Sequence, residues 1–287
     1  MTRRNTLTPY LFLFPAMAGL LLFKFYPLLN GFVASFFADS FSTHSKIFVG
    51  LRNYVDALTS SIFLNSLWVT VLFNLIVNPL QIVLAMALAM FLVKEIRGKK
   101  VFRTIQIIPI VVSFPIACIL WSIILNPEQG LVNSLLNLVR IPNQPFLTDR
   151  NQALWSIIGI STWKGVGYWA IFLIAGLQQI SSSIYESAWI DGAHGWRTFW
   201  SITLPQMKQP LLFVVIADTV SNFLIFAPQY LITKGGPEKS TDFLMYEVFK
   251  NAYEYSNVGG AMAMMVILIV VVLAVIGLEG RLLRDSR

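Results

Sequence analysis

Residues 185–205 read YESAWIDGAHGWRTFWSITLP, a long polar segment that lies between two apolar runs of the chain. Its apolar side chains recur at helical spacing in two short stretches, and Gly192 separates them. Glycine readily adopts the left-handed backbone conformation that often ends a helix. The segment therefore predicts a short helix, a break at Gly192, and a second short helix that ends at Leu204-Pro205.

The first of these helices has a start signal and one apolar face. Ser183 and Glu186 have the spacing of a capping box, in which both side chains satisfy free amides of the first turn. The residues expected on the apolar face are Ile184, Tyr185, Ala188 and Trp189. The second stretch carries Trp196, Phe199, Trp200 and Ile202. Such a pair either docks into a groove of a partner protein or rests at the lipid interface, where tryptophan also collects.

The sequence on both sides of this segment is that of a membrane protein. Of 287 residues, 56% are hydrophobic and 12% are charged, about half the charged fraction of a soluble domain. Six apolar segments have the roughly 20 residues that a bilayer crossing needs: 9–37, 62–93, 101–125, 152–177, 208–232 and 258–280. We predict a single all-α integral membrane domain over 1–287, with six transmembrane helices and the polar segment 181–207 between helices four and five. The first span is expected to stay uncleaved.

The distribution of lysine and arginine predicts the orientation of these spans. One side of the membrane would hold twelve of them: Arg3, Arg4, Lys94, Arg97, Lys99, Lys100, Arg103, Arg197, Lys208, Arg281, Arg284 and Arg287. The other side would hold seven: Lys46, Arg52, Arg140, Arg150, Lys234, Lys239 and Lys250. Because cytoplasmic loops carry the excess, both termini and the segment 181–207 are expected on the cytoplasmic side of the cell membrane.

Several kinds of chemistry lack the residues that they need. One cysteine, Cys118, and two distant histidines give no basis for a disulfide or a metal cluster. In KGGPEKST, at 234–241, Glu238 stands where a phosphate-binding loop requires glycine before its lysine. We therefore expect no enzyme activity, no metal and no cofactor in this chain. The net charge of +7 follows the loops rather than one helix face, which argues against nucleic-acid binding.

Three charged residues fall in the middle of predicted spans: Lys24, Lys164 and Asp218. Charges at that depth usually face a cavity or a partner. Aromatic faces with a few hydrogen-bonding groups suit a sugar-like solute. The candidates for lining a solute path are Trp163, Lys164, Tyr168, Asp218, Asn222, Phe226 and Gln229. The alternative is that the aromatics face lipid and that Asp218 pairs structurally with Lys164.

Other residues of the spans predict how the helices pack. Asn74, Asn78 and Gln81 share roughly one face of the second span. Gly165 and Gly167 allow a close approach of another backbone to the fourth span. The prolines at 27 and 79 predict kinks.

The spacing from Glu186-Ser187-Ala188 through Gly192 to Ile202-Thr203-Leu204-Pro205 resembles the EAA loop of binding-protein-dependent ABC importer permeases. The DGA at 191–193 and the FWSITLP at 199–205 look like the carbohydrate-uptake branch, the maltose-type and glycerol-phosphate-type permeases. Further segments similar to that branch are FVGLRNYVDAL (48–58), FRTIQIIPIVVS (102–113), ITKGGPEKST (232–241) and GGAMAMMVIL (259–268). Ser187 departs from the alanine that is usual in the family.

The resemblance implies a permease subunit of an ATP-driven importer for a sugar, an oligosaccharide or a related polyol derivative. In the family the EAA loop forms coupling helices that dock into the ATPase subunit. The residues carried over to that role are Ile184, Glu186, Ala188, Trp189, Asp191, Gly192 and Pro205. The expected partners are a second permease, two ATPase subunits that use ATP and Mg, and an extracytoplasmic solute-binding protein. The alternatives are an ion-gradient-driven secondary transporter and an ABC permease for a non-carbohydrate solute.

Overall fold

The computed structural model of the chain describes residues 8–39, 46–94 and 97–285. Arg3, Arg4 and Arg287, which contribute to the predicted orientation, lie outside these residues. Most of the described chain is helical, as predicted. A short hairpin accompanies the helices, in which β1 (Phe37–Asp39) pairs antiparallel with β2 (Lys46–Phe48). Aromatic side chains stabilise this hairpin, in which the rings of Phe37 and Phe48 pack edge to face with centroids 5.4 Å apart.

The chain folds as two compact units, residues 1–64 with 247–269 and residues 65–246 with 270–287. In the first unit, α1 (Thr8–Leu20), the π-helical turn η1 (Leu21–Phe25) and α2 (Tyr26–Ala34) form the first span. The hairpin, α3 (Arg52–Thr59) and η4 (Lys250–Glu254) complete this unit with the start of α14 (Val258–Asp285). Gly259 lets α14 approach β1, because a Cβ there would lie 1.8 Å from the carbonyl oxygen of Phe37.

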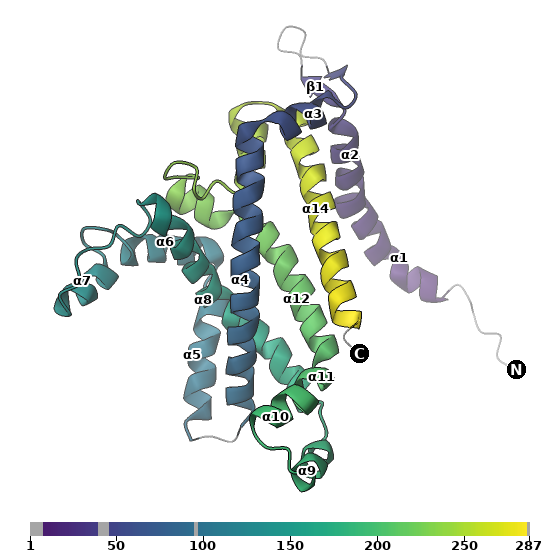
Figure 1. Ribbon diagram of the computed structural model, residues 1–287. Coiled ribbons are helices and arrows are strands. Elements are labelled where there is room, and N and C mark those ends of the chain that lie inside the picture. The colour runs from purple at the N-terminus through teal and green to yellow at the C-terminus, as the bar shows by residue number, and fades with distance from the viewer. Residues whose placement is uncertain (1–7, 40–45, 95–96, 286–287) are drawn as a thin grey trace, which may run out of the picture. The chain divides into compact units, whose positions relative to one another are not determined.

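The second unit is built on long helices that lie side by side (Figure 1). They are α4 (Ser61–Val93), α5 (Lys99–Val111), α8 (Arg150–Gln178) and α12 (Lys208–Phe223). Helix α8 packs against both α5 and α12. Its start is fixed by Asp149, whose carboxylate accepts hydrogen bonds from the amides of Asn151 and Gln152. Shorter elements follow α5 and α12: α6 (Phe114–Ile124), α7 (Leu131–Leu138), η3 (Gln229–Thr233) and α13 (Leu244–Phe249).

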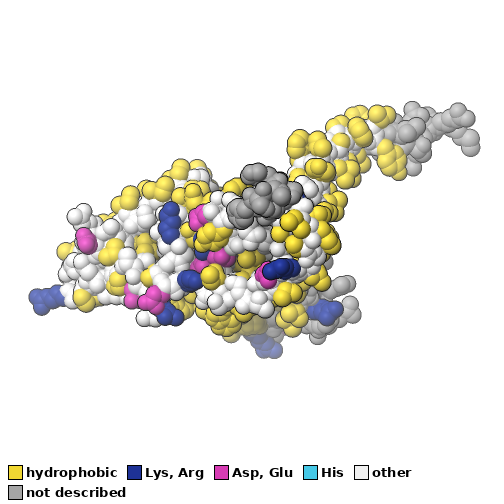
Figure 2. Space-filling model, turned by 90° about the horizontal axis from the view of Figure 1, so that it is seen from above, with side chains coloured by type: hydrophobic (Ala, Val, Ile, Leu, Met, Phe, Trp, Pro, Cys, Tyr) yellow, Lys and Arg dark blue, Asp and Glu magenta, His cyan; other side chains and the backbone are white. Residues whose placement is uncertain are grey.

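Apolar side chains both fill the core of this unit and cover its outside. One cluster joins Met86 on α4, Leu173 on α8 and Val214 on α12. Many large hydrophobic side chains are nevertheless exposed, including Leu75 and Ile123. Figure 2 shows Lys, Arg, Asp and Glu side chains scattered among hydrophobic ones on the face seen from above. The many large hydrophobic side chains that are exposed suit lipid rather than water.

Two predicted spans are interrupted in the structure. The segment 101–125 is not one helix, because α5 and α6 meet at a bend of 102°. The backbone is extended at Val112 and Ser113, and Pro115 lies in the first turn of α6, where a helix needs no amide hydrogen. The segment 208–232 is likewise interrupted after Phe223, and Pro228 has no amide hydrogen for the carbonyl of Leu224.

Four helical stretches in the described chain are long and apolar enough to span a membrane, or five if the bent pair counts as one. They are Tyr10–Ala34, Ser61–Val93, Arg150–Gln178 and Val258–Leu282. Helix α12 has 16 residues, fewer than the roughly 20 that a crossing needs. The count of six transmembrane helices therefore stays a prediction.

Candidate functional site

A cavity of about 440 Å³ lies in the second unit, among residues of α4, the α5–α6 bend, α8 and α12. Five of the seven predicted path residues line it: Lys164, Tyr168, Asp218, Asn222 and Phe226. The other two lie elsewhere. Trp163 packs edge to face against Trp121, with ring centroids 5.6 Å apart, and Gln229 is fully buried in η3.

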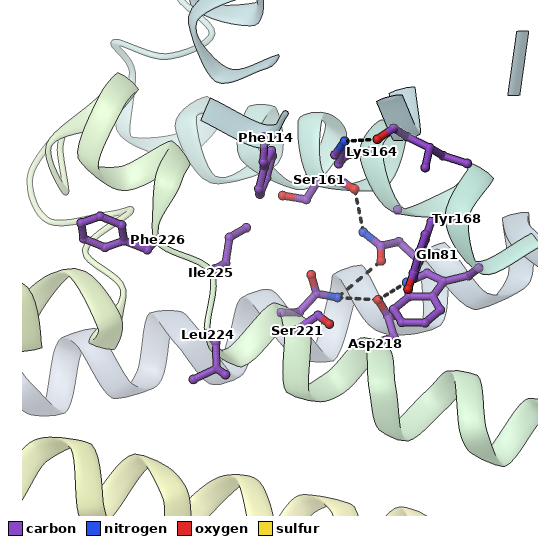
Figure 3. A pocket seen from close by; sticks show the side chains of 14 residues that line it. Gln81, Phe114, Ser161, Lys164, Tyr168, Asp218, Ser221, Leu224, Ile225 and Phe226 are labelled. Carbon is purple, nitrogen blue, oxygen red and sulfur yellow. Dashed lines mark hydrogen bonds between the residues drawn. The ribbon is translucent and has the colours of Figure 1, made fainter. Parts of the chain in front are cut away.

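A buried hydrogen-bond network centres on Asp218 (Figure 3). Its Oδ1 accepts hydrogen bonds from the indole Nε1–H of Trp169 at 2.6 Å and from the amide of Asn222 at 3.0 Å. The Asn222 amide also donates to Oδ1 of Asn78, at 2.7 Å. The polar face of the second predicted span therefore packs inward, because Asn78 on this face accepts a hydrogen bond from α12.

Gln81 extends this network to α8, where its amide donates to the backbone carbonyl of Ser161 at 2.8 Å. Gly165 makes room for the Gln81 side chain, since a Cβ there would lie 2.7 Å from Oε1. Gly167 has the same role toward α5: a Cβ would lie 2.6 Å from the backbone oxygen of Gln106. The predicted close approach of another backbone is thus present at Gly167, whereas at Gly165 a side chain approaches instead.

Lys164 does not pair with Asp218, so the predicted alternative of a structural ion pair is wrong. Its ammonium group donates instead to the backbone carbonyls at the end of α5: Pro109 at 2.5 Å, Ile110 at 3.2 Å, and Val112. The bend leaves these carbonyls without the amide partners that a continuing helix would supply. Lys164 therefore caps α5 from α8, and it also lines the cavity.

Several polar residues of this region were not among the candidates predicted from the sequence. Ser161 and Ser221 line the cavity. Ser161 precedes Lys164 by three positions, so their shared helix face was a usable signal. Glu279 accepts a hydrogen bond from the hydroxyl of Thr219, at 2.8 Å. Its place at the edge of the last predicted span gave no sign of this inward contact.

The polar segment 181–207 forms the predicted helix, break and helix at one end of the second unit (Figure 1). Helix α9 (Ser182–Ile190) ends at Gly192, whose φ is +79°. The amide of Gly192 donates to Trp189 and that of Ala193 to Ala188, which is the Schellman arrangement of a helix end. The predicted capping box is wrong, because Ser183 lies inside the first turn and its hydroxyl pairs with that of Ser181.

The two faces of α9 have different surroundings. Ala188 is 6% exposed, and the hydroxyl of Tyr185 pairs with that of Thr203 in the following helix. Trp189 and Ile190 are 59% and 87% exposed, and Ile184 is partly so. Glu186 and Asp191 are also exposed. The surface that α9 offers outside its own chain therefore combines apolar side chains with two acidic ones.

The second part of the segment is helical over α10 (Trp196–Thr198), the π-helical turn η2 (Phe199–Thr203) and α11 (Leu204–Gln206). Trp196 stacks on Phe199, and Trp200 packs against both, with ring centroids 5.3 to 5.7 Å apart. Pro205 lies in the first turn of α11 and is exposed. The aromatics of this segment thus form one exposed cluster.

The residues at 234–241 form a turn, as expected. Gly235 has a φ of +79°, and the hydroxyl of Thr241 donates to the carbonyl of Gly236 at 2.6 Å. Within the described ranges, no group of three or more histidine, cysteine, aspartate and glutamate side chains is placed to hold a metal ion.

Both the sequence and the fold of this chain match those of known proteins. The family described as "Binding-protein-dependent transport system inner membrane component" matches residues 81–284. The chain is 34% identical to the sn-glycerol-3-phosphate transport system permease protein UgpA of Agrobacterium fabrum, over 96% of this chain and 94% of that one. It is 32% identical to the trehalose/maltose transport system permease protein MalF of Thermococcus litoralis, over the same shares.

Two solved structures have the same fold. A chain of a bacterial ABC transporter involved in the import of the acidic polysaccharide alginate matches with a TM-score of 0.79 at 21% identity. The match covers 97% of this chain and 96% of that one. A chain of the alginate transporter in complex with an alginate pentasaccharide-bound periplasmic protein matches with a TM-score of 0.77 at 22% identity, over 94% and 91% of the two chains.

Proposed function

The chain belongs to the family of binding-protein-dependent transport system inner membrane components, and from this premise we propose that it carries a carbohydrate or a related polyol derivative through the membrane. It is the permease subunit of an ABC importer and not an enzyme. The observation that carries the proposed solute path is the cavity at Asp218 and Asn222, where a buried hydrogen-bond network meets aromatic walls.

The cavity has the composition that a sugar needs. Tyr168 and Phe226 supply flat apolar surfaces, against which the C–H faces of a sugar ring pack. Asp218, Asn222 and Gln81 supply hydrogen-bonding groups on one wall (Figure 3). Few polar groups in a mostly apolar cleft are the usual make-up of a small-molecule site. Trp163 and Gln229 are not part of this proposal, because they lie outside the cavity.

We propose that the exposed surface of α9 and α10 docks into a groove of an ATPase subunit. Ile184, Trp189 and Ile190 would bury their side chains there, and Glu186 would make the polar contact at the edge. Asp191 and Gly192 shape the turn that holds this surface, while Pro205 starts the last helical turn. Ala188 has a supporting role only, because it is buried within its own chain.

The assembly that follows has a second permease, two ATPase subunits and an extracytoplasmic binding protein. The ATPase subunits would use ATP and Mg, and closure of their pair would move the α9 surface. That movement would expose the cavity to one side of the membrane and then to the other. The excess of lysine and arginine on one side places both termini and α9 in the cytoplasm in this proposal. Only a cytoplasmic α9 can reach such an ATPase.

Replacing Trp189 by serine is expected to weaken binding of the ATPase subunit by roughly 30-fold, because truncating a central tryptophan of an interface costs about 2 kcal/mol or more. The measurement is the amount of ATPase that co-purifies with the tagged permease as the detergent-solubilised complex is diluted. Tyr185→Phe is the matched control on the same helix, since its hydroxyl contacts only Thr203 among the described residues. Equal retention by wild type and Trp189→Ser would show that this face does not dock.

A further inference from the structure

The proposed carbohydrate path raises the question of solute charge. Among the relatives, the UgpA permeases of four bacteria are named for glycerol 3-phosphate, an anion, and MalF is named for the neutral sugars trehalose and maltose. Family membership therefore leaves the charge of the solute open. Of the described residues that line the cavity, two are charged, Lys164 and Asp218, and their hydrogen bonds decide what each can offer a solute.

Lys164 has no hydrogen left for an anion. A lysine ammonium group has three N–H donors, and this one is bonded to the three backbone carbonyls of Pro109, Ile110 and Val112. Releasing any of them would leave a carbonyl of the α5–α6 bend unpaired inside the protein. All three N–H donors of Lys164 are thus engaged by the fold itself.

Asp218 offers an acceptor instead. Its Oδ1 already receives two hydrogen bonds, from Trp169 and Asn222. Its Oδ2 is buried and has no hydrogen-bond partner among the described residues, and the whole residue is 1% exposed. The hydroxyl oxygen of Ser161, on the opposite side of the same cavity in Figure 3, is also buried without a partner within the described chain.

On the basis of the proposed function, we infer that this cavity accepts neutral, hydroxyl-rich sugars and excludes acidic or phosphorylated ones. A sugar hydroxyl donates a hydrogen to Oδ2 of Asp218, and another pairs with Ser161. A carboxylate or a fully ionised phosphate group has no hydrogen to donate, finds the three N–H donors of Lys164 already engaged, and lies next to the negative charge of Asp218. An anion that loses its water in such a place is strongly disfavoured.

The test compares three probes that differ at one carbon: methyl glucoside, methyl glucuronide, which is an anion, and methyl glucuronamide, its neutral counterpart. Each is titrated by saturation-transfer NMR against the whole importer complex in nanodiscs, without the binding protein. The two neutral probes are expected to bind with similar affinity. The glucuronide is expected to bind roughly tenfold more weakly or worse, because each 1.4 kcal/mol is a factor of ten.

Asp218→Asn keeps the network, since its amide oxygen can accept both existing hydrogen bonds while an NH₂ group replaces Oδ2. In this variant the affinities for glucoside and glucuronide are expected to differ by about threefold or less. The reason is that the anion then meets a hydrogen-bond donor in place of a negative charge. Asp56→Asn makes the same chemical change in an exposed ion pair of α3 that is not part of the cavity lining, and it should leave the ratio of the two affinities unchanged.

Equal affinities of the wild type for glucoside and glucuronide would overturn this inference. So would a ratio of these two affinities that is the same in the wild type and in Asp218→Asn. Failure of all three probes to bind would overturn it as well. None of these results bears on docking of the ATPase subunit or on ATP-driven uptake, so failure of charge selection and failure of the proposed function can be told apart.

Discussion

Gly167→Ala is expected to destabilise the protein strongly, although it adds a single methyl group. The new Cβ would lie 2.6 Å from the backbone oxygen of Gln106, a separation that real side chains do not adopt. Because the oxygen belongs to the backbone of α5, the whole helix must move. The hydrogen bond from the Gln106 side chain to the carbonyl of Gly167, 2.8 Å long, is strained by the same movement. Overpacking of this kind costs roughly 1–3 kcal/mol.

Two other glycines of α8 provide a graded control for this prediction. At Gly159 a Cβ would meet nothing within 4 Å, so Gly159→Ala should leave stability unchanged or slightly raised. At Gly165 the Cβ would meet the side chain of Gln81 rather than a backbone atom. Because a side chain can move aside more easily than a backbone, the loss of stability in Gly165→Ala should be intermediate. The measurement is the thermal unfolding temperature of the purified complex by tryptophan fluorescence. Equal melting temperatures for Gly159→Ala and Gly167→Ala would contradict the close contact between α5 and α8.

Gly192→Val is expected to abolish co-purification of the ATPase subunit while the permease still inserts into the membrane. The residue has a φ of +79° and ends α9. The left-handed conformation costs an L-residue about 1–2 kcal/mol in conformational free energy, and it costs a β-branched residue more. The turn would therefore open, and Trp189 and Ile190 would no longer be held beside the aromatic cluster of α10.

Gly192→Asn separates this effect from steric crowding. Asparagine tolerates the left-handed conformation better than other side chains, and a Cβ at this position would meet nothing within 4 Å. The asparagine variant should therefore retain most of the ATPase that the wild type binds. Loss of binding in both variants would point to a contact made by Gly192 itself, and retention in both would show that the turn is unimportant for docking.

The sequence predicted the parts of the fold that depend on local backbone rules. Gly192 marked the end of α9 because a left-handed residue was required there. The capping box failed although Ser183 has the required spacing to Glu186, because the helix starts two residues earlier, with Ser181 as its N-cap. The apolar face of α9 was predicted as a whole, but Tyr185 pairs with Thr203 and Ala188 is buried within its own chain.

The errors in the membrane region have a common physical cause. Hydropathy detects apolar length and cannot see that two of the apolar segments are interrupted close to Pro115 and Pro228. The partners of Lys164 were likewise hidden, because backbone carbonyls exist at every position and become available only where a helix bends. Asp218 and Asn222 could be identified as inward-facing, since buried polar groups in a membrane need partners. The particular partners, Trp169 and Asn78, follow from the packing of three helices.

ATP-dependent uptake by the reconstituted importer tests the central claim most directly. Proteoliposomes carrying this chain, the second permease and the ATPase subunits are supplied with the binding protein and a labelled neutral sugar that it binds. Uptake is expected to require ATP on the side that α9 faces and to stop when the ATPase subunits are omitted or cannot hydrolyse ATP. Uptake that persists without the ATPase subunits and follows a proton or sodium gradient would contradict the account.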